Sequence, residues 1–303
     1  MNLKAIDAAV AAYRTKLDVA DGARLAFFRE VWGVQDAVAA DAARAVAYEA
    51  PAADDLLAWF GASEPVLAHA PVALDAALLA DAVARVAACL AEHGGFSSGV
   101  AEAFARTKWD RVVAASDVAL AGGDPAAYAE GFADLLVDDG MGEDQARTGA
   151  LAASLALRAV LDAPASMLAR ALRDAGAATP HPICCPVCGG PAAVGRVGDV
   201  EATQGRGRQL WCGQCGTAWD FERVRCARCG TQNQGHLHYS NVEGDDAHRL
   251  AACDECGGYL RTVYQADALA PFSFEVEDVV MARLDLIAYR QAVAEAAKGL
   301  DRI

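Results

Sequence analysis

Four Cys-x-x-Cys pairs lie between positions 185 and 256 of this 303-residue chain. The second two pairs repeat the first two at an offset of 41 residues, so both halves read Cys-x2-Cys-x23-Cys-x2-Cys. Two residues between cysteines let both sulfurs reach one ion from a tight turn, here called a knuckle. Two knuckles supply the four thiolates of a closed tetrahedral site. The spacing therefore predicts two metal sites.

The paired cysteines divide into two predicted ligand sets. Site one comprises Cys185, Cys188, Cys212 and Cys215. Site two comprises Cys226, Cys229, Cys253 and Cys256. The second and third knuckles are separated by only ten residues and could instead share one ion. The repeat favours the first assignment, because repeated modules generally fold unit by unit.

Every knuckle is followed by a glycine, which permits a positive φ that turns backbone amides toward sulfur. These glycines are Gly189, Gly216, Gly230 and Gly257. Amide donors aimed at thiolates spread their charge and tune the site. Trp211 and Trp219 bracket the second knuckle, where we expect them to shield the sulfurs from water.

The ion is not fixed by the spacing, since four thiolates in a tetrahedron accept zinc or iron. Geometry alone favours zinc, and most such sites serve as structural scaffolds. A closed site leaves no open position for a substrate, so hydrolytic metal catalysis is not expected. The sequence also lacks a Gly-rich phosphate loop, a Ser-His-Asp arrangement and a His-Glu-x-x-His motif. We therefore expect a protein that is not an enzyme.

The remaining cysteines and histidines have weaker claims on the metal sites. Cys184 breaks the repeat, and we expect it not to be a ligand. Cys89 follows an apolar helical stripe and is predicted to be a small buried side chain. His236 and His238 are expected on one face of a strand, in a hydrogen-bonding or interface role. His181 is predicted to be an exposed linker residue.

The charge balance disfavours nucleic acid as a partner. The chain carries 26 basic and 41 acidic side chains, a formal charge of -15, which repels phosphate backbones and anionic membranes. Residues 181–265 hold eight arginines, no lysine and nine acidic residues, so the cysteine region is not net basic either. A protein partner is the more natural expectation, with a zinc-ribbon adaptor as a further alternative.

We expect a cytoplasmic protein without a membrane span. The N-terminus shows no basic, apolar and small-residue series of a signal peptide. The longest apolar stretch, Leu151 to Leu161, is too short to cross a bilayer and carries Ser154 and Arg158. Cytoplasmic thiols stay reduced, which favours metal ligation over disulfides.

The elements that must hold the cysteines are predicted to form an α+β fold. Residues 1–178 read as a bundle of six to eight helices, with one stripe formed by Leu79, Val83, Val86 and Leu90. Helix breaks are expected at Asp21-Gly22 and at Gly122-Gly123, and Asp124-Pro125 should begin the next helix.

Composition changes at Gly176 to Pro182, where helix formers give way to glycine, proline and cysteine. Short strands are predicted at Gln209 to Trp211, Leu237 to Asn241 and Tyr259 to Tyr264. After Pro271 a helix should resume, with Val276, Val279, Val280, Leu284 and Ile287 on one face. The predicted domains are 1–178, helical; 179–222 and 223–266, two metal modules; and 267–303, a C-terminal helical segment.

The cysteine region resembles the formate dehydrogenase accessory proteins of the FdhE type. The matching segments are Cys185-Pro-Val-Cys-Gly, Leu210-Trp-Cys-Gly-Gln-Cys, Trp219, Val224-Arg-Cys-Ala-Arg-Cys, His238-Tyr239 and Cys253-Asp-Glu-Cys-Gly-Gly-Tyr-Leu. They cover roughly residues 180–266, and the likeness is weaker in Val276 to Tyr289 and in the helical part.

The resemblance implies two rubredoxin-like modules after a helical domain, with iron rather than zinc in the two four-cysteine sites. It also implies a cytoplasmic assembly factor, a chaperone in protein maturation, that binds the catalytic subunit of respiratory formate dehydrogenase before export. The alternative reading of the same residues is a rubredoxin-like electron-transfer or redox-sensing protein. Neither reading fixes the oligomeric state, the client isoenzyme or the binding surface.

Overall fold

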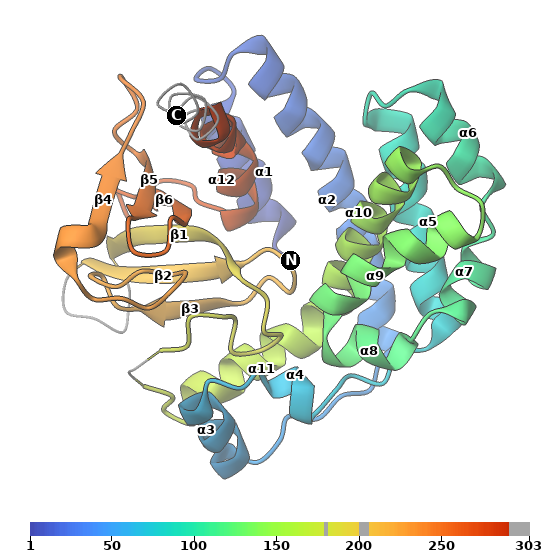
Figure 1. Cartoon of the computed structure of the whole chain (residues 1–303), viewed down its shortest axis with the longest axis horizontal. Coiled ribbons are helices and arrows are strands. Elements are labelled where there is room, and N and C mark those ends of the chain that lie inside the picture. The colour runs from blue at the N-terminus through green and yellow to red at the C-terminus, as the bar shows by residue number, and fades with distance from the viewer. Residues whose placement is uncertain (179–180, 200–205, 291–303) are drawn as a thin grey trace, which may run out of the picture. The chain divides into compact units, whose positions relative to one another are not determined.

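Helices make up most of the chain up to residue 178 in the computed structural model, which describes residues 1–178, 181–199 and 206–290 (Figure 1). They are α1 (Leu3–Tyr13), α2 (Val19–Ala45), α3 (Ala53–Ala62), α4 (Val66–His69), α5 (Ala76–His93), α6 (Ser98–Arg106), α7 (Trp109–Ala115), α8 (Val118–Gly123), α9 (Pro125–Asp138), α10 (Glu143–Val160) and α11 (Asp162–Asp174). The extra helices relative to the six to eight expected are α4, α7 and α8, with 4, 7 and 6 residues. Helices of at most two turns are too short to show a clear apolar period in the sequence.

The helix α5 shows how the sequence directs this part of the fold. The Asp75 carboxylate accepts the backbone N–H groups of Ala77 and Leu78 and so caps the helix start. The predicted stripe of Leu79, Val83, Val86 and Leu90 is fully buried, which confirms that this face packs into the core. The core also takes in the small apolar face of α10 and the aromatic residues of α6, α7 and α9.

Two of the predicted helix boundaries are confirmed and one is wrong. Asp124 caps α9 by accepting the N–H of Ala127, with Pro125 at the first helical position, and α8 ends at Gly123. The break expected at Asp21-Gly22 instead lies inside the first turn of α2, because the Asp18 carboxylate accepts the N–H of Asp21 at 2.8 Å and starts the helix earlier. A long helix tolerates one glycine at a cost of about 1 kcal/mol.

The cysteine region contributes one mixed sheet of six strands in the order β3-β2-β1-β6-β5-β4. The strands are β1 (Ala192–Asp199), β2 (Arg206–Cys212), β3 (Ala218–Phe221), β4 (Leu237–Ser240), β5 (His248–Cys253) and β6 (Tyr259–Tyr264). β1 pairs with β6 in parallel, whereas β5 is antiparallel to both β4 and β6. The three predicted strands are present as β2, β4 and β6, and the α+β class is confirmed.

The 41-residue offset seen in the cysteines also relates the strands. It maps the last residue of β2, Cys212, onto the last residue of β5, Cys253, and maps β3 onto the start of β6. Across the sheet the strands β3, β2 and β1 are followed in the corresponding order by β6, β5 and β4. The two sets meet where β1 pairs with β6. The strands of the two repeats therefore share one sheet.

The C-terminal part departs from the single helix that was expected. The helix α12 (Phe274–Val280) ends at Val280, a turn follows at Met281, and the chain is helical again over 282–290. Val276, Val279, Val280 and Leu284 are buried, as their spacing predicted, and Ile287 is partly buried. The predicted segment extends to 303, and its residues from 291 lie outside those that the structure describes.

Contacts divide the chain into two compact units. The helical unit comprises Met1–Lys4, Ala26–Pro191 and Trp211–Trp219, and the sheet unit comprises Ala5–Leu25, Ala192–Leu210 and Asp220–Ile303. All site-one cysteines belong to the helical unit, and all site-two cysteines to the sheet unit. The four predicted domains stay a prediction, since these units follow contacts and cut across the sequence.

Within the sheet unit, α1 and α12 lie side by side (Figure 1) and are joined by a buried polar cluster. The Tyr13 hydroxyl donates to the Glu277 carboxylate at 2.8 Å. The His248 ring lies between two carboxylates, with Nε2 2.9 Å from Glu277 and Nδ1 2.8 Å from Asp245. Arg283 donates to Asp245 from the last helical stretch. This cluster fixes the first and last helices of the unit to the start of β5.

Among the described residues, no single helix has the length and apolar character needed to cross a membrane. The bent pair α10 and α11 meets that requirement jointly, by length and composition alone. Their buried residues belong to the helical unit, where α10 packs against α5 and α9.

Candidate metal centres

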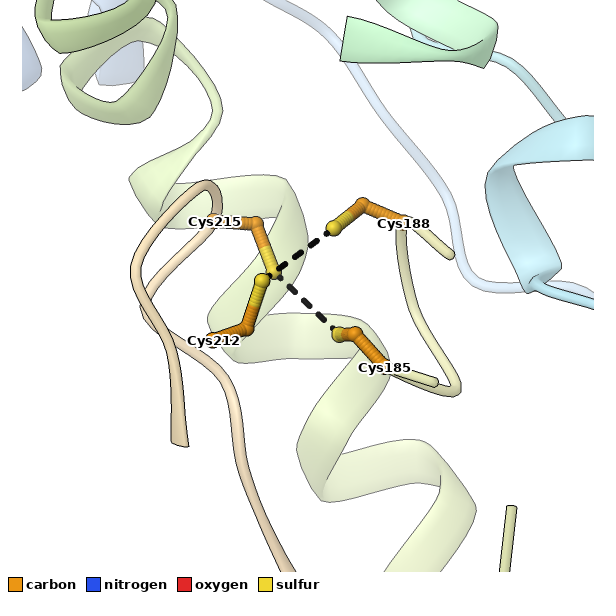
Figure 2. A group of neighbouring side chains, drawn as sticks. All are labelled: Cys185, Cys188, Cys212 and Cys215. Carbon is orange, nitrogen blue, oxygen red and sulfur yellow. Dashed lines mark hydrogen bonds between the residues drawn. The ribbon is translucent and has the colours of Figure 1, made fainter. Parts of the chain in front are cut away.

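The four sulfurs of site one converge from two knuckles (Figure 2). Cys185 and Cys188 lie before β1, and Cys212 and Cys215 lie at the end of β2 and beyond it. The Sγ atoms of Cys185 and Cys215 are 3.5 Å apart, as are those of Cys188 and Cys212. All four sulfurs lie within 4.8 Å of one another, and each residue is at most 2% exposed. The structure thus groups these cysteines as the repeat predicted.

Site two repeats this arrangement in the sheet unit. The Sγ atoms of Cys226 and Cys256 are 3.8 Å apart, as are those of Cys229 and Cys253. Here two of the four residues are buried, whereas Cys229 and Cys256 are exposed to solvent. The alternative that joined the second and third knuckles into one site is excluded by this grouping.

The sulfur spacing fits a metal tetrahedron. A metal–sulfur bond of about 2.3 Å places the corners of a regular tetrahedron about 3.8 Å apart. The closest sulfur pairs lie at 3.5 Å in site one and 3.8 Å in site two. A disulfide requires about 2.05 Å, so the cysteines are not bonded to one another. Four converging soft thiolates are the donor set of zinc and iron sites.

All four knuckles use the same two backbone hydrogen bonds. The N–H of the following glycine donates to the carbonyl of the first cysteine, at 2.9 to 3.0 Å. The N–H of the first cysteine donates to the carbonyl five residues later, at 2.8 to 3.0 Å. The glycines have the positive φ that was predicted, namely 78° at Gly189, 79° at Gly216, 80° at Gly230 and 69° at Gly257. In site two the N–H of Arg228 also reaches Cys226 Sγ at 3.3 Å.

The thiols influence one another's ionisation strongly. In site one, burial raises the pKa of Cys185 well above its usual range. Hydrogen bonds from Cys185, Cys188 and Cys212 lower the pKa of Cys215 well below its usual range. One thiolate therefore forms readily at the expense of its neighbours. Ionising all four in a buried site requires a compensating cation, which a divalent metal supplies.

Site two also contains a buried thiol whose pKa is lowered, Cys226. Burial opposes ionisation of Cys226, but the backbone N–H groups of Cys229 and Arg228 lower its pKa to about 7. The backbone N–H of Thr231 opposes any rise in the pKa of Cys229, but desolvation and hydrogen bonds to the other thiols together raise it to about 12. A metal that takes all four sulfurs must release these held protons, so binding will be pH-dependent.

Two elements of the helical unit hold the knuckles of site one. The backbone N–H groups of Val66 and Leu67, at the start of α4, donate to the carbonyls of Pro186 and Val187 at 3.0 and 2.9 Å. On the other side, Arg158 of α10 lies 4.8 Å over the Trp211 ring, next to Cys212. Site one therefore lies against α4 and against the core helix α10.

Site two has acidic neighbours instead. Between Cys253 and Cys256 lie Asp254 and Glu255, both exposed. His238 Nε2 lies 2.6 Å from the Asp254 carboxylate, and His236 Nδ1 lies 3.3 Å from Glu255. The prediction that both histidines share a strand is wrong, since His236 closes a 3-10 turn (Gln234–His236) and only His238 lies in β4. Their hydrogen-bonding role is confirmed.

The other sequence candidates lie as follows. Cys184 is exposed and outside both sulfur groups, and Cys89 is buried in α5, as predicted. Trp211 and Trp219 are buried, and the Trp219 indole donates to the Pro182 carbonyl at 3.0 Å. His181 was expected to be an exposed linker residue, but it is half-buried because its ring packs edge-on against Phe60.

Arg158 and Ser154 were not identified from the sequence as contributors to a metal site. Ser154 Oγ donates to the Gln214 side chain at 3.1 Å, inside the second knuckle. A signal was present, since these two polar residues interrupt an apolar helix at a spacing of four and so share one face. That spacing marks a polar contact within an otherwise alanine-rich core helix.

Comparison with curated proteins finds relatives that match part of this chain. No family model matches this sequence. The chain is 39% identical over 82 residues to Protein FdhE of Escherichia coli O1:K1 / APEC and to Protein FdhE of Shigella boydii serotype 18. Each match covers 27% of this chain and spans about a quarter, 25%, of the relative's own length.

A solved structure shares the fold of the chain more broadly. It is the crystal structure of the FdhE protein from Pseudomonas aeruginosa, with a TM-score of 0.51 and 19% sequence identity. The match covers 95% of this chain and 89% of that one. At this identity the likeness shows a common fold. The chain is thus similar to proteins named FdhE, in sequence over 82 residues and in fold over most of its length.

Proposed function

We propose that this protein is an accessory factor required for formate dehydrogenase activity and is not itself an enzyme. The observation that carries the proposal is the pair of four-cysteine groups in a chain that is similar to proteins named FdhE. Their closed tetrahedral spacing leaves no position for a substrate, which supports a role in assembly rather than turnover.

In this proposal each four-cysteine group holds one iron ion, with zinc as the alternative. Cys185, Cys188, Cys212 and Cys215 would hold the first, and Cys226, Cys229, Cys253 and Cys256 the second. When bound, iron would supply one-electron chemistry and zinc would supply structure alone. In either case the ion joins segments that are distant in sequence, which stabilises the fold around the knuckles.

The proposed partner is the catalytic subunit of respiratory formate dehydrogenase, bound in the cytoplasm before export. The formal charge of -15 supports a protein partner over nucleic acid or an anionic membrane. Contact of site one with α4 and α10 supports a scaffold in which metal loading organises a surface of the helical unit.

Deletion of the gene tests the proposal. The deletion strain should still synthesise the catalytic subunit but lose membrane formate dehydrogenase activity, and the wild-type gene should restore it. A double variant, Cys212→Ser with Cys253→Ser, should fail to restore activity. An exposed control, Cys184→Ser, should restore it fully. Normal activity in the deletion strain would refute the accessory role.

A second candidate function is electron transfer or redox sensing. The solvent exposure of Cys229 and Cys256 favours it, because an electron-transfer centre needs an edge near its partner. Protein purified without oxygen would then show thiolate-to-iron absorption that bleaches reversibly on reduction. A colourless protein containing only zinc would exclude this function while leaving the accessory role intact.

A further inference from the structure

Arg158 lies at the second knuckle of site one although it belongs to α10, a core helix. The residue is only 5% exposed. Its guanidinium carbon lies 4.8 Å over the ring of Trp211, which directly precedes Cys212. Its Nη1 atom lies 3.5 Å from the carbonyl oxygen of Gly213, which directly follows Cys212. A fixed positive charge is thus buried beside a site-one ligand, Cys212.

The knuckle leaves room for this side chain at Gly216, directly after Cys215. A Cβ atom built on Gly216 would lie 2.7 Å from Arg158 Nη1, closer than such atoms approach in practice. One turn earlier on α10, Ser154 donates to the Gln214 side chain at 3.1 Å. The residues between and beside Cys212 and Cys215 therefore lie against two polar side chains of α10, Ser154 and Arg158.

Burial makes this charge important for a metal-loaded site. Four thiolates and one divalent ion carry a net charge of about −2, and placing that charge in a low-dielectric interior is costly unless a cation lies near. The cysteines of site one are at most 2% exposed, so water cannot supply the compensation. The guanidinium is held against the knuckle by stacking and by the Gly213 carbonyl.

The second knuckle of site two has different neighbours from that of site one. Adding 41 to Gly213 and Gln214 gives Asp254 and Glu255, which are acidic and exposed. Adding 41 to Gly216 gives Gly257, where a Cβ would meet nothing within 4 Å. Site two instead has a buried arginine at its first knuckle, since Arg208 is 5% exposed and donates from Nη1 to the carbonyl oxygen of Arg225, directly before Cys226, at 2.9 Å.

We propose that Arg158 is a positioning and charge-compensating residue that sets the affinity of site one for a divalent metal ion. This rests on the proposal that site one holds a metal. Residues that orient or compensate metal ligands typically change affinity by about 10–100-fold when replaced. Site two should not depend on Arg158.

Zinc titration of the full-length protein tests this inference. Site one is isolated by Cys226→Ser with Cys229→Ser, and the dissociation constant for Zn²⁺ is measured against a competing chelator in metal-free buffer. Arg158→Met, which keeps length but removes charge, should weaken binding by about 10–100-fold. Arg158→Lys, which keeps the charge, should weaken it less. Arg147→Met, on an exposed part of α10, should leave it unchanged.

A purely structural role for Arg158 gives a different result. It would lower the thermal midpoint of the metal-free and zinc-loaded proteins equally, whereas charge compensation lowers that of the loaded protein more. Equal zinc affinity in Arg158→Met and wild type, or equal weakening by Arg158→Lys and Arg158→Met, overturns the inference. Failure of the wild-type site to bind Zn²⁺ refutes instead the proposal that site one is a metal site.

Discussion

Sites one and two have the same knuckles in different surroundings. Both bring four sulfurs within 4.8 Å, and both use positive-φ glycines and the same pair of backbone hydrogen bonds. Site one is wholly buried in the helical unit, whereas Cys229 and Cys256 of site two are exposed in the sheet unit. Local sequence therefore specifies how sulfurs converge, and the tertiary environment decides how accessible and how charged each site is.

The difference also separates the roles the two sites can serve. Site one ties its knuckles to α4 through the N–H groups of Val66 and Leu67, and to α10 through Arg158. Site two faces solvent, with exposed acidic residues paired to histidines. A change at site one should therefore reach the helical core, whereas a change at site two should stay near the sheet.

Loss of a ligand should give the largest contrast. Cys212→Ser and Cys253→Ser occupy equivalent repeat positions, and each should remove one metal equivalent while the other site stays loaded. Because site one lies against the core helix α10, Cys212→Ser should destabilise the helical unit by at least about 5 kcal/mol, or roughly 10–20 °C in thermal midpoint. Metal analysis and thermal unfolding followed by helical circular dichroism measure this.

The two variants serve as each other's control. Cys253→Ser should leave the helical transition near its wild-type midpoint. Equal loss of helical stability in both variants would remove the distinction between the sites, and loss of both metals from either single variant would contradict independent closure.

The sheet unit should also respond to pH through His248. Although burial opposes protonation, hydrogen bonds to Asp245 and Glu277 raise the pKa of His248 to about 9. The protonated His248 ring stabilises the folded state by about 3 kcal/mol in total. This stabilisation is fully present below the unfolded pKa of about 6.5 and is lost as pH rises through 9. The other groups facing the ring are Tyr13, which donates to Glu277, and Arg283, which pairs with Asp245.

Unfolding midpoints of the metal-loaded protein between pH 6 and 10 measure this loss. The His248→Gln variant should be less stable than wild type at pH 6. Its unfolding midpoint should also lack the fall that His248 causes in wild type as pH rises from 6.5 to 9. Parallel curves for the two proteins would show that His248 does not titrate with folding. The difference curve cancels thiol titration, which both proteins share.

Sequence reasoning was most successful where the signal is local. The grouping of eight cysteines, the positive φ after each knuckle and the buried stripe of Leu79, Val83, Val86 and Leu90 follow from spacing and backbone sterics. Each depends on residues a few positions apart, or on a repeat that the sequence displays directly.

The remaining features depend on contacts that spacing does not encode. The break expected at Asp21-Gly22 was wrong because a capping carboxylate at Asp18 starts α2 before the glycine. The joining of the strands of both repeats into one sheet depends on the pairing of β1 with β6, whose residues lie more than 60 positions apart. The unequal burial of two identical cysteine patterns comes from helices that are distant in the sequence.

Alanine substitutions at the equivalent glycines should sharpen the contrast between the sites. Gly257→Ala meets nothing within 4 Å and costs only the backbone strain of φ +69°, about 1–2 kcal/mol. Gly216→Ala has the same strain at φ +79° and also places a Cβ 2.7 Å from Arg158, so it should cost at least about 1 kcal/mol more. Urea unfolding of the two loaded variants measures the difference, and equal costs would show that Arg158 moves aside freely.

Metal release to a chelator should give the smallest contrast, about tenfold or somewhat more, with site two losing its ion first. A chelator must reach a ligand before it can displace it. Cys229 and Cys256 offer that access from solvent, whereas the four cysteines of site one are at most 2% exposed and need local opening of the knuckles. The rate at each site is assigned with Cys212→Ser and Cys253→Ser, each of which retains a single ion. Release from site one that is as fast as from site two would mean that the helices it lies against open on the timescale of the assay. In that case burial in the folded state would not distinguish the rates at which the two sites release their ions.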